Sequence, residues 1–439
     1  LLAWKSDGSQ LASVEKEVRG IRVWDIGRRD KPRFVNVGDS FITAMSWRPS
    51  SQILASSDSE GTIYFFDSAK WEKVKRVQGH IGPIAALVWR PDGGALASAG
   101  QDGTIQIWDP DQLGSPVPFR VLATADIKTI SSVSFSPLGQ YMEIGDYEDG
   151  PSSRPSITYI QKVGTRNRYK VSGNIHWSPD DRYFFTDGSD HINFTMDGSV
   201  AFKFHKSDFV EWSADGQRLA SVRGQAIHLW AFTPTLSVNA TLRSSASRVL
   251  YVGWNPNGKW LASVSSKEHL LIEIWDVATA KLAWQGKPST SIISATVPWW
   301  SRKGSYLLLG HEDGTLEIRE APYTKPLRII PSESGWKNWF RASPDERYVL
   351  STEESTGAIR VWDLRSPRET PTLTLRGHTN KVNAIVWSPD GKRLVTASQD
   401  ASVKIWDLAT GDAVLTLNDR TLGPLDSLWF DGKYLRARA

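Results

Sequence analysis

Residues 387–407 read Trp387-Ser-Pro-Asp-Gly-Lys-Arg-Leu-Val-Thr-Ala-Ser-Gln-Asp-Ala-Ser-Val-Lys-Ile-Trp-Asp407, and variants of this stretch recur along the chain, most clearly at residues 89–109 and 254–276. Successive copies are about 35 to 46 residues apart and cluster near 42, which is the span of a four-stranded propeller blade. Such a period predicts a repeat protein whose function is carried by its surfaces. The residues that precede the turn mark the copies, and they are Trp4, Trp47, Trp89, Phe135, Trp177, Trp212, Trp254, Trp300, Ala342, Trp387 and Leu428.

The composition is that of a soluble globular protein, with 40% hydrophobic and 23% charged residues among 439. No run approaches the roughly 18 apolar residues of a membrane-spanning segment, so no membrane association is expected. The net charge of +4 is spread thinly over the repeats. Nucleic-acid binders concentrate their charge, so nucleic acid is not the expected partner. The absence of cysteine excludes disulfides, thiolate nucleophiles and cysteine-ligated zinc.

Each repeat reads as four strands joined by short turns. In the copy near the C-terminus, Val382–Trp387 is rich in β-branched residues and alternates as a half-buried strand does. The Ser-Pro-Asp-Gly sequence at 388–391 reverses the chain, because proline presets its own φ and glycine accepts a positive φ. Further strands are predicted at 394–398, 403–406 and 413–417. A sheet of this kind has two apolar faces, so radial stacking of blades is the arrangement that buries both.

The recurring Gly-His, Leu-Ala-Ser, Asp-Gly and Ile-x-Ile-Trp-Asp elements resemble the WD-repeat family over essentially the whole chain. The resemblance implies an all-β WD-repeat β-propeller of about ten four-stranded blade units. In two repeats it also implies the hydrogen-bonded His–Ser–Asp–Trp tetrad with which this family pins a blade. A buried polar network is stable only when every member has a partner, so we predict a structural role for both sets. The sets are His80, Ser98, Asp102 and Trp108, and His378, Thr396, Asp400 and Trp406.

In the other repeats some or all of the tetrad residues are replaced. In the second repeat, Phe66 stands in place of Trp and Glu60 in place of Asp, and the eighth repeat ends in Arg319. The fourth and fifth repeats have no Trp-Asp pair. These departures put the tetrad in doubt in those repeats, although each repeat is still expected to form a blade.

The number of repeats favours parts of two propellers. The chain has eleven turn markers, and its two ends do not supply complementary parts of one blade. Most WD-repeat rings have seven blades, and seven markers counted from the end reach Trp177, just after the irregular stretch 145–170. We therefore predict about four blades of a first propeller in residues 1–170 and about seven of a second in residues 171–439. One large ring is the alternative, and the start inside a repeat suggests the C-terminal part of a larger protein.

Three groups of residues could carry chemistry, and each has a plainer structural explanation. His80, Ser98 and Asp102 resemble a catalytic trio, but their positions are locked to the repeat and recur in the second tetrad. The acidic turn at 145–150 lacks the spacing of a calcium loop, and the basic-aromatic cluster at 154–170 fits a solvated strand edge. The eight histidines show no His-Glu-x-x-His spacing. We therefore predict no catalytic residue, no metal and no cofactor.

Loops on one face of the blades supply the candidate partner-binding residues. The loops that enter the first strands share this face with the Asp-bearing turns, and the tetrads should hold them rigid, which lowers the entropy cost of binding. Trp299 and Trp336 lie in such loops, where a tryptophan is either a binding anchor or packed between blades. The candidates are Ile81, Gln101, Trp299, Trp336, Lys381 and Gln399.

No reactive constellation is visible in the blades, which favours a non-catalytic protein-interaction scaffold or ligand-sensing module that binds a protein or peptide on the propeller face. The last repeats resemble the WD-repeat tails of bacterial and fungal multidomain signalling proteins, and we expect a cytoplasmic signalling protein. Two alternatives stay open. An RNA-binding or translation-factor-like propeller requires basic residues gathered on one face, and a propeller enzyme requires acids or histidines lining its channel. The sequence makes no prediction of the oligomeric state.

Overall fold

The computed structural model shows an all-β chain built from four-stranded antiparallel sheets. Ten four-stranded sheets and a final two-stranded sheet lie within the described residues, in agreement with the blade count that the period predicts. One short 3-10 helix, η1 (Pro110–Gln112), is present, and no helix of the described chain is long and apolar enough to cross a membrane. The structure describes residues 2–14, 19–25, 32–112, 120–123, 130–146, 157–165, 168–186, 191–194, 199–203, 209–233, 235–266, 270–286, 299–310, 315–323, 325–330, 341–353, 356–366, 368, 370–388, 390–418, 427–430 and 435–438.

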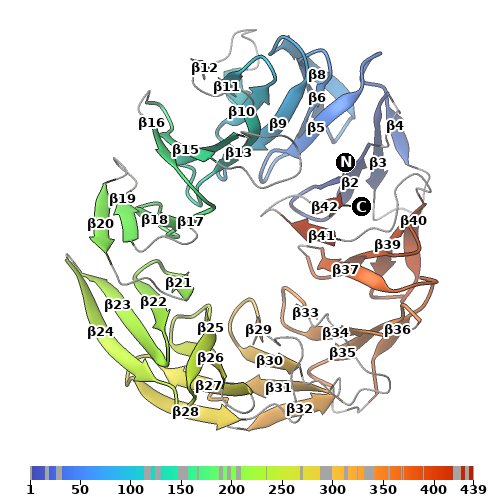
Figure 1. Cartoon of the computed structure of the whole chain (residues 1–439). Helices are drawn as coiled ribbons and strands as arrows, with labels where there is room; N and C mark the ends of the chain where they lie inside the picture. The colour runs from blue at the N-terminus through green and yellow to red at the C-terminus, as the bar shows by residue number, and fades with distance from the viewer. Residues whose placement is uncertain are drawn as a thin grey trace. The chain divides into compact units, whose positions relative to one another are not determined.

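The chain separates into two compact units, and the first comprises residues 1–203 and 429–436. It contains blades 1 to 5, which are β1–β4, β5–β8, β9–β12, β13–β16 and β17–β20, with neighbouring strands adjacent in chain order (Figure 1). The strands are β1 (Leu2–Trp4), β2 (Gln10–Ser13), β3 (Ile21–Asp25), β4 (Arg33–Val35), β5 (Ile42–Trp47), β6 (Ile53–Asp58), β7 (Thr62–Asp67), β8 (Glu72–Gln78), β9 (Ile84–Trp89), β10 (Leu96–Gly100), β11 (Thr104–Trp108), β12 (Arg120–Ala123), β13 (Ile130–Phe135), β14 (Tyr141–Asp146), β15 (Ile157–Lys162), β16 (Arg168–Val171), β17 (Ile175–Trp177), β18 (Tyr183–Thr186), β19 (His191–Phe194) and β20 (Val200–Lys203).

The second unit comprises residues 204–428 and 437–439. It contains blades 6 to 10, which are β21–β24, β25–β28, β29–β32, β33–β36 and β37–β40, whereas the last two strands, β41 and β42, form the two-stranded sheet and have residues in both units. The strands are β21 (Phe209–Trp212), β22 (Arg218–Arg223), β23 (Ala226–Thr233), β24 (Thr235–Arg243), β25 (Arg248–Trp254), β26 (Trp260–Ser266), β27 (Leu270–Asp276), β28 (Lys281–Gly286), β29 (Trp299–Trp300), β30 (Tyr306–Gly310), β31 (Leu316–Glu320), β32 (Pro326–Ile330), β33 (Arg341–Ala342), β34 (Tyr348–Thr352), β35 (Ile359–Asp363), β36 (Leu373–Leu375), β37 (Val382–Trp387), β38 (Arg393–Ser398), β39 (Ser402–Asp407), β40 (Ala413–Asn418), β41 (Ser427–Phe430) and β42 (Leu435–Arg438).

The compact units do not decide how the blades divide between propellers. The first unit continues through blade 5 to residue 203, whereas the sequence-based boundary at residue 170 falls at the end of blade 4. A compact unit is not by itself a propeller. The division into about four and about seven blades therefore stays a prediction.

A serine hydroxyl closes the turn between the first and second strands of most blades. In blade 10, Ser388 Oγ accepts the N–H of Arg393 at 3.0 Å and donates to Asp390 Oδ1 at 2.5 Å, and Gly391 has a φ of 69°. Since the hydroxyl is satisfied locally, the serine can be buried completely. The same N–H···Oγ bond, 2.9–3.0 Å long, closes five other turns, at Ser136, Ser178, Ser213, Ser301 and Ser343.

The apolar cores lie between successive blades of each unit. In the first unit, one cluster around Leu54 joins blades 1 and 2, and another around Trp89 joins blades 2 and 3. In the second unit, Leu261 is central to the cluster of blades 6 and 7, and Leu394 to that of blades 9 and 10. Both faces of an inner blade are thereby buried, which is the physical requirement that the repeat pattern imposes.

The tryptophan that ends a first strand also ties its blade to the preceding one. The first strand is an edge strand of its sheet, so some of its carbonyl groups have no partner within the blade. The indole N–H of the next blade satisfies one of these carbonyls, as buried tryptophan requires. The Nε1···O distances are 2.9–3.2 Å for the pairs Trp47–Ala3, Trp89–Ser46, Trp254–Glu211 and Trp300–Gly253.

Candidate interaction site

In blade 3, His80, Ser98, Asp102 and Trp108 form one chain of hydrogen bonds. His80 precedes β9, Ser98 lies on β10, Asp102 lies in the turn between β10 and β11, and Trp108 ends β11. Trp108 Nε1 lies 2.9 Å from Ser98 Oγ, and this oxygen lies 2.8 Å from His80 Nε2. His80 Nδ1 lies 3.0 Å from Asp102 Oδ1, and the imidazole is 0% exposed. The structure therefore brings all four residues together in a buried network.

Blade 10 builds the same network with a threonine hydroxyl. Trp406 Nε1 lies 2.9 Å from Thr396 Oγ1, which lies 2.7 Å from His378 Nε2. His378 Nδ1 lies 2.8 Å from Asp400 Oδ2. Thr396 is fully buried, as Ser98 is, so threonine supplies the same buried hydroxyl.

When the imidazole is neutral, each donor hydrogen of the network has one acceptor. The indole N–H donates to the hydroxyl, the hydroxyl donates to Nε2, and the N–H at Nδ1 donates to the carboxylate. Burial lowers the pKa of His378, against the opposing effect of Asp400, so the ring is neutral at pH 7. Burial by itself would raise the pKa of Asp400, but hydrogen bonds from Ser402, the N–H of Thr379 and His378 bring it down to about 2.

The two carboxylates also hold the loop that enters the first strand. Asp102 Oδ2 accepts the N–H of Ile81 at 3.0 Å, and Asp400 Oδ2 accepts the N–H of Thr379 at 2.9 Å. Both ring nitrogens of His80 and His378 are engaged inside the blade. The trio that resembles a catalytic site therefore has no exposed base to offer a substrate, and its geometry is that of a clamp on a surface loop.

The clamped loops place several of the predicted partner-binding residues at the surface. Ile81 is 88% exposed, and the N–H of its neighbour across the face, Gln101, donates to Pro83 O at 3.0 Å. In blade 10 the N–H of Gln399 donates to Lys381 O at 2.9 Å, which places these two residues on the corresponding face. Gln101 and Gln399 are exposed, Lys381 is half-buried, Trp299 at the start of β29 is 39% exposed, and Trp336 lies outside the described residues.

The Trp–hydroxyl bond of the tetrad extends beyond the two blades that have histidine. In each case the indole N–H of the third strand donates to a hydroxyl on the second strand at 2.9–3.1 Å. This bond pins the two strands even where the His–Asp half is absent. The additional pairs are Trp24–Ser13, Trp230–Ser221, Trp275–Ser263 and Trp362–Ser351.

Blades 2 and 8 are among those in which another residue stands at the tryptophan position of the third strand. In blade 2, Phe66 occupies this position, and the buried hydroxyl of Ser56 has no hydrogen-bond partner among the described residues. In blade 8, Arg319 takes the tryptophan position and Leu309 the hydroxyl position, so no hydroxyl is left without a donor. The Arg319 guanidinium lies 3.7 Å from the ring centroid of Trp284 and 2.5 Å from Glu317 Oε1.

These differences predict opposite effects for two matched substitutions. Ser98→Ala removes the relay between Trp108 and His80 and leaves two buried donors or acceptors unpaired, so we expect a loss of about 1–3 kcal/mol in unfolding free energy. Ser56→Ala removes a hydroxyl that has no partner, so we expect no loss and a small gain. Chemical denaturation of both variants measures the difference. Equal losses would contradict the network as the origin of the effect.

Blade 7 contains a network that the sequence reasoning missed. The Glu273 side chain is 0% exposed and accepts hydrogen bonds from Ser263 Oγ at 3.3 Å, Ser265 Oγ at 3.2 Å and the N–H of Ser245 at 3.2 Å. Ser263 in turn accepts the indole N–H of Trp275. The carboxylate thus replaces histidine as the group to which the strand hydroxyl donates. Its signal in the sequence is an acidic residue inside the Ile-x-Ile-Trp-Asp element.

Two more buried carboxyl groups were also missed, and both lie on strands that pack between blades. Glu143 on β14 accepts hydrogen bonds from Trp177 Nε1 and from Ser134 Oγ, and burial raises its pKa despite these donors. Glu211 on β21 has a buried Oε2 without a hydrogen-bond partner in the described structure, and burial raises its pKa to about 8. A glutamate at a small or apolar position of the repeat is the signal that could have found them.

The remaining sequence candidates do not assemble into a site. In the basic-aromatic cluster, Arg168 Cζ lies 5.7 Å from the ring centroid of Tyr159, whereas residues 154 and 166 lie outside the described residues. Residues 147–150 of the acidic turn also lie outside them. No group of three or more His, Asp or Glu side chains in the described part of the chain could hold a metal ion.

Antiparallel four-stranded blades with cores between them and with His–hydroxyl–Asp–Trp networks inside them define a repeat protein of the β-propeller class. The family described as "WD domain, G-beta repeat" matches residues 32–67, 71–109 and 369–407. Three stretches of this chain are therefore WD repeats, and a curated relative is by name a WD repeat-containing protein.

Known proteins support this assignment over parts of the chain. Target of rapamycin complex subunit wat1 of Schizosaccharomyces pombe is 33% identical over 22% of this chain and 30% of its own length. WD repeat-containing protein AAC3 of Dictyostelium discoideum is 26% identical over 46% of each. The chain thus spans less than half the length of either relative. A crystal structure described as the eukaryotic initiation factor superposes with a TM-score of 0.56 at 17% identity, covering 81% of this chain and 92% of that one, which shows the fold alone.

Proposed function

We propose that this chain is a non-catalytic scaffold that binds a protein or peptide on the face formed by the second-to-third strand turns and the loops into the first strands. WD repeats imply a protein-interaction role, and one relative is by name a complex subunit. A module that senses a ligand within a larger cytoplasmic signalling protein is the finer form of this proposal.

The proposal rests mainly on an exposed apolar side chain whose backbone N–H is fixed by a buried network. Ile81 is 88% exposed although its N–H is fixed by Asp102, which is itself held by His80 and Thr104. A rigid exposed apolar residue loses little entropy on binding and gains by desolvation, which are the properties of an interface anchor.

The neighbouring blade has an exposed aromatic side chain on the loop into its first strand. Phe41 precedes β5, is 46% exposed, and its carbonyl accepts the N–H of Ser59 in the turn between β6 and β7 at 2.9 Å. The guanidinium of Arg19 lies 5.5 Å from the Phe41 ring centroid. An aromatic residue capped by arginine is typical of the side-chain types enriched at protein interfaces.

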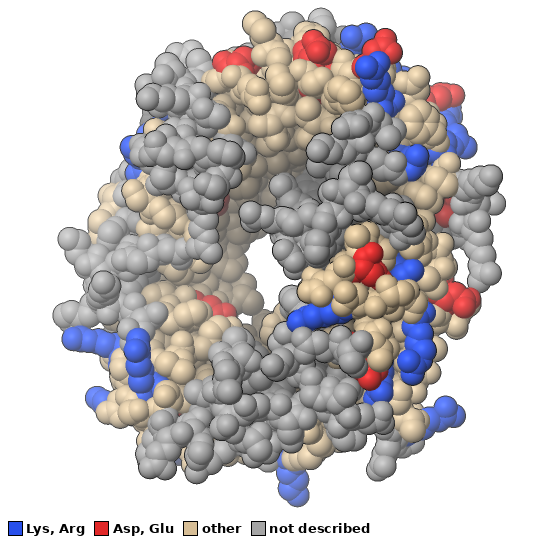
Figure 2. Space-filling view, turned by 45° about the vertical axis from the view of Figure 1, so that its right-hand side comes forward, with Lys and Arg blue, Asp and Glu red and all other residues tan. Residues whose placement is uncertain are grey.

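The alternatives receive less support from the described residues. An enzyme needs an accessible acid or base, and the tetrad histidines are buried with both nitrogens engaged. A nucleic-acid binder needs a concentrated basic surface, whereas on the described part of the face in Figure 2 the Lys and Arg side chains lie in small groups among Asp, Glu and uncharged residues. Protein binding therefore accounts best for the surface.

Site-specific photocrosslinking tests the proposal. A benzoylphenylalanine placed at Ile81 in the full-length protein should form a covalent product with a protein partner in cells. Leu138 is a matched control, because it is 54% exposed but lies in a turn between first and second strands, at the other end of the strands. We expect no product from position 138.

With the purified partner, the contribution of Ile81 to the binding affinity can be measured. We expect Ile81→Ala to weaken binding about tenfold without a change in melting temperature. Crosslinking to position 138 alone, or full affinity in Ile81→Ala, would reject this face as the interface.

A further inference from the structure

Blade 6 carries two arginines and a histidine together on one strand face. On β22, β23 and β24, Val222, Ile227 and Leu242 belong to the apolar core that blade 6 shares with blade 7. Side chains alternate along a strand, so the residues next to these point to the opposite face. Two rows of paired residues lie side by side there, and they are Arg223–Ala226–Arg243 and Ser221–His228–Thr241.

The three basic side chains of this face are close to one another and accessible. Arg223 and Arg243 both pair with Ala226, so their Cα atoms are two strand spacings apart, which is roughly 10 Å. Both arginines are exposed, and His228 is half-buried. Burial, and then the positive charges of Arg243 and Arg223, lower the pKa of His228, so its ring is neutral at pH 7. The two guanidinium groups can therefore converge on one ligand beside the imidazole.

No acid of the described structure neutralises this face. Neither Arg223 nor Arg243 forms a hydrogen bond or an ion pair with a described residue. In the same part of the chain His228 has one hydrogen bond, in which its Nδ1 lies 3.1 Å from Thr241 Oγ1. When the threonine hydroxyl donates to Nδ1, the neutral ring keeps its N–H at Nε2 and can offer it to a ligand.

In other blades the two positions that Arg223 and His228 occupy neutralise or satisfy each other. One stands two residues after the serine that accepts the indole N–H, and the other two residues before the tryptophan that donates it. In blade 9 they are Glu353 and Arg360, whose charged groups lie 3.9 Å apart. In blade 7 the serine hydroxyl at the first position donates to the carboxylate at the second at 3.2 Å. In blade 6 both positions are basic.

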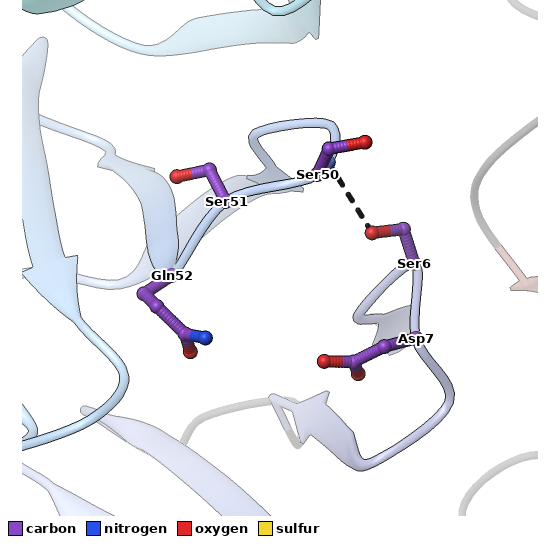
Figure 3. Close-up of a pocket in the computed structure, with 5 residues that line it drawn as sticks. All are labelled: Ser6, Asp7, Ser50, Ser51 and Gln52. Carbon is purple, nitrogen blue, oxygen red and sulfur yellow. Dashed lines mark hydrogen bonds between the residues drawn. The ribbon is translucent and has the colours of Figure 1, made fainter.

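The polar groups at the turns of blades 1 and 2 also have partners within the chain, although a cavity of about 470 Å³ lies beside them (Figure 3). Lys5 Nζ lies 2.6 Å from Gln52 Oε1 and 3.0 Å from Asp7 Oδ2. The N–H of Ser50 donates to Ser6 Oγ at 3.3 Å. The basic face of blade 6 differs from these turns, because its donors have no acidic acceptor in the described chain.

We propose that the basic face of blade 6 binds a phosphate monoester group through Arg223, Arg243 and His228. A phosphate dianion balances the charges of both guanidinium groups and has three oxygens to accept their hydrogen bonds, which a single carboxylate does not. The forked donors of arginine match phosphate oxygens in pairs. The site is carried by the strands of blade 6, and its binding does not depend on the Ile81 contact of the proposed function.

Isothermal titration calorimetry on the intact protein, in a buffer free of phosphate, tests the class of ligand. The probes are glycerol 3-phosphate and the peptide acetyl-Gly-phosphoserine-Gly-amide. At least one of them should bind at about millimolar concentration or below, and the tighter of the two identifies a small metabolite or a phosphoprotein as the source. The peptide acetyl-Gly-Asp-Gly-amide should bind about tenfold more weakly. Equal binding of the aspartate peptide, or no binding of either phosphate, would overturn the assignment.

Matched variants locate the binding on blade 6. Arg223→Gln and Arg243→Gln should each weaken phosphate binding about tenfold, because each removes one set of charge-assisted donors. Arg302→Gln changes an exposed arginine in the turn between β29 and β30, and it should leave the affinity unchanged. Full affinity in both blade 6 variants, or an equal loss in Arg302→Gln, would overturn the site.

A charge reversal gives a second readout that does not need the ligand. Arg223→Glu introduces the acid that blade 9 has at this position, where Glu353 pairs with Arg360. The variant should lose phosphate binding and should melt at a slightly higher temperature than the parent without ligand, because attraction to Arg243 replaces repulsion. Retained phosphate binding, or a melting temperature below that of the parent, would contradict a face of unpaired positive charges.

Discussion

Glu211→Gln should raise the melting temperature at pH 8 and above and should reduce the fall in stability between pH 4.5 and 8. Glu211 has a buried Oε2 that receives no hydrogen bond in the described structure. Burial raises the pKa of this carboxyl from 4.5 to about 8, an effect that the N–H of Trp254 only partly offsets. The neighbouring Tyr251 has its pKa raised to about 12, by burial and by Glu211, so it stays neutral throughout this window.

The sign of the effect follows from proton linkage. Between pH 4.5 and 8 the folded protein holds a proton on Glu211 that the unfolded chain has released. The unfolding free energy therefore falls as pH rises through this window, by on the order of 4 kcal/mol in total. The contribution is fully present below pH 4.5 and is lost once pH passes the folded pKa of about 8. Glutamine has no proton to release, so the variant keeps its stability.

Glu143→Gln provides the matched control. Glu143 is also buried with a raised pKa, but its carboxyl group accepts hydrogen bonds from Trp177 and Ser134. Glutamine retains only one oxygen to accept these bonds, so this variant should lose stability at neutral pH. Thermal melts of the parent and both variants from pH 4 to 9 test whether the two substitutions have these different effects on stability. An unchanged pH profile in Glu211→Gln would show that Glu211 does not hold its proton.

Asp102→Ala and Asp400→Ala should each destabilise the protein by about 1–3 kcal/mol or more. Removal of Asp102 leaves His80 Nδ1 and the N–H groups of Ile81 and Thr104 without their acceptor. In blade 10, removal of Asp400 has the same effect on His378 and Thr379. Because these donors are held at the surface end of a buried network, water can replace the carboxylate only in part.

Asp92→Ala is the control for this prediction. Asp92 pairs with Arg90 on the surface, and its pKa is lowered to about 2 chiefly by that hydrogen bond. Surface pairs contribute about 0–1 kcal/mol, so its loss should be small. Denaturant titrations compare the three variants. If the Asp102 and Asp400 variants unfold like the Asp92 variant, the tetrads are not structural and a functional role for them regains weight.

The repeat and its internal bonds could be predicted from the sequence because their parts are close together in the chain. Ser388, Asp390 and Gly391 form their turn within four positions, and the same local chemistry recurs in other blades. The members of a tetrad stand at fixed offsets within one repeat, so a family pattern can name them. The strands and the clamped histidines therefore follow from local periodicity.

Only the tertiary structure decided which groups meet between repeats. Glu211 and Trp254 are 43 positions apart, and Lys5 of blade 1 donates to Gln52 in the turn of blade 2. No offset within a repeat predicts these choices, because they depend on how two twisted sheets pack and on the space left between their turns. The sequence determines the blade, because its hydrogen bonds are local. The packing of one blade on the next determines where a carboxyl oxygen is buried without a hydrogen-bond partner.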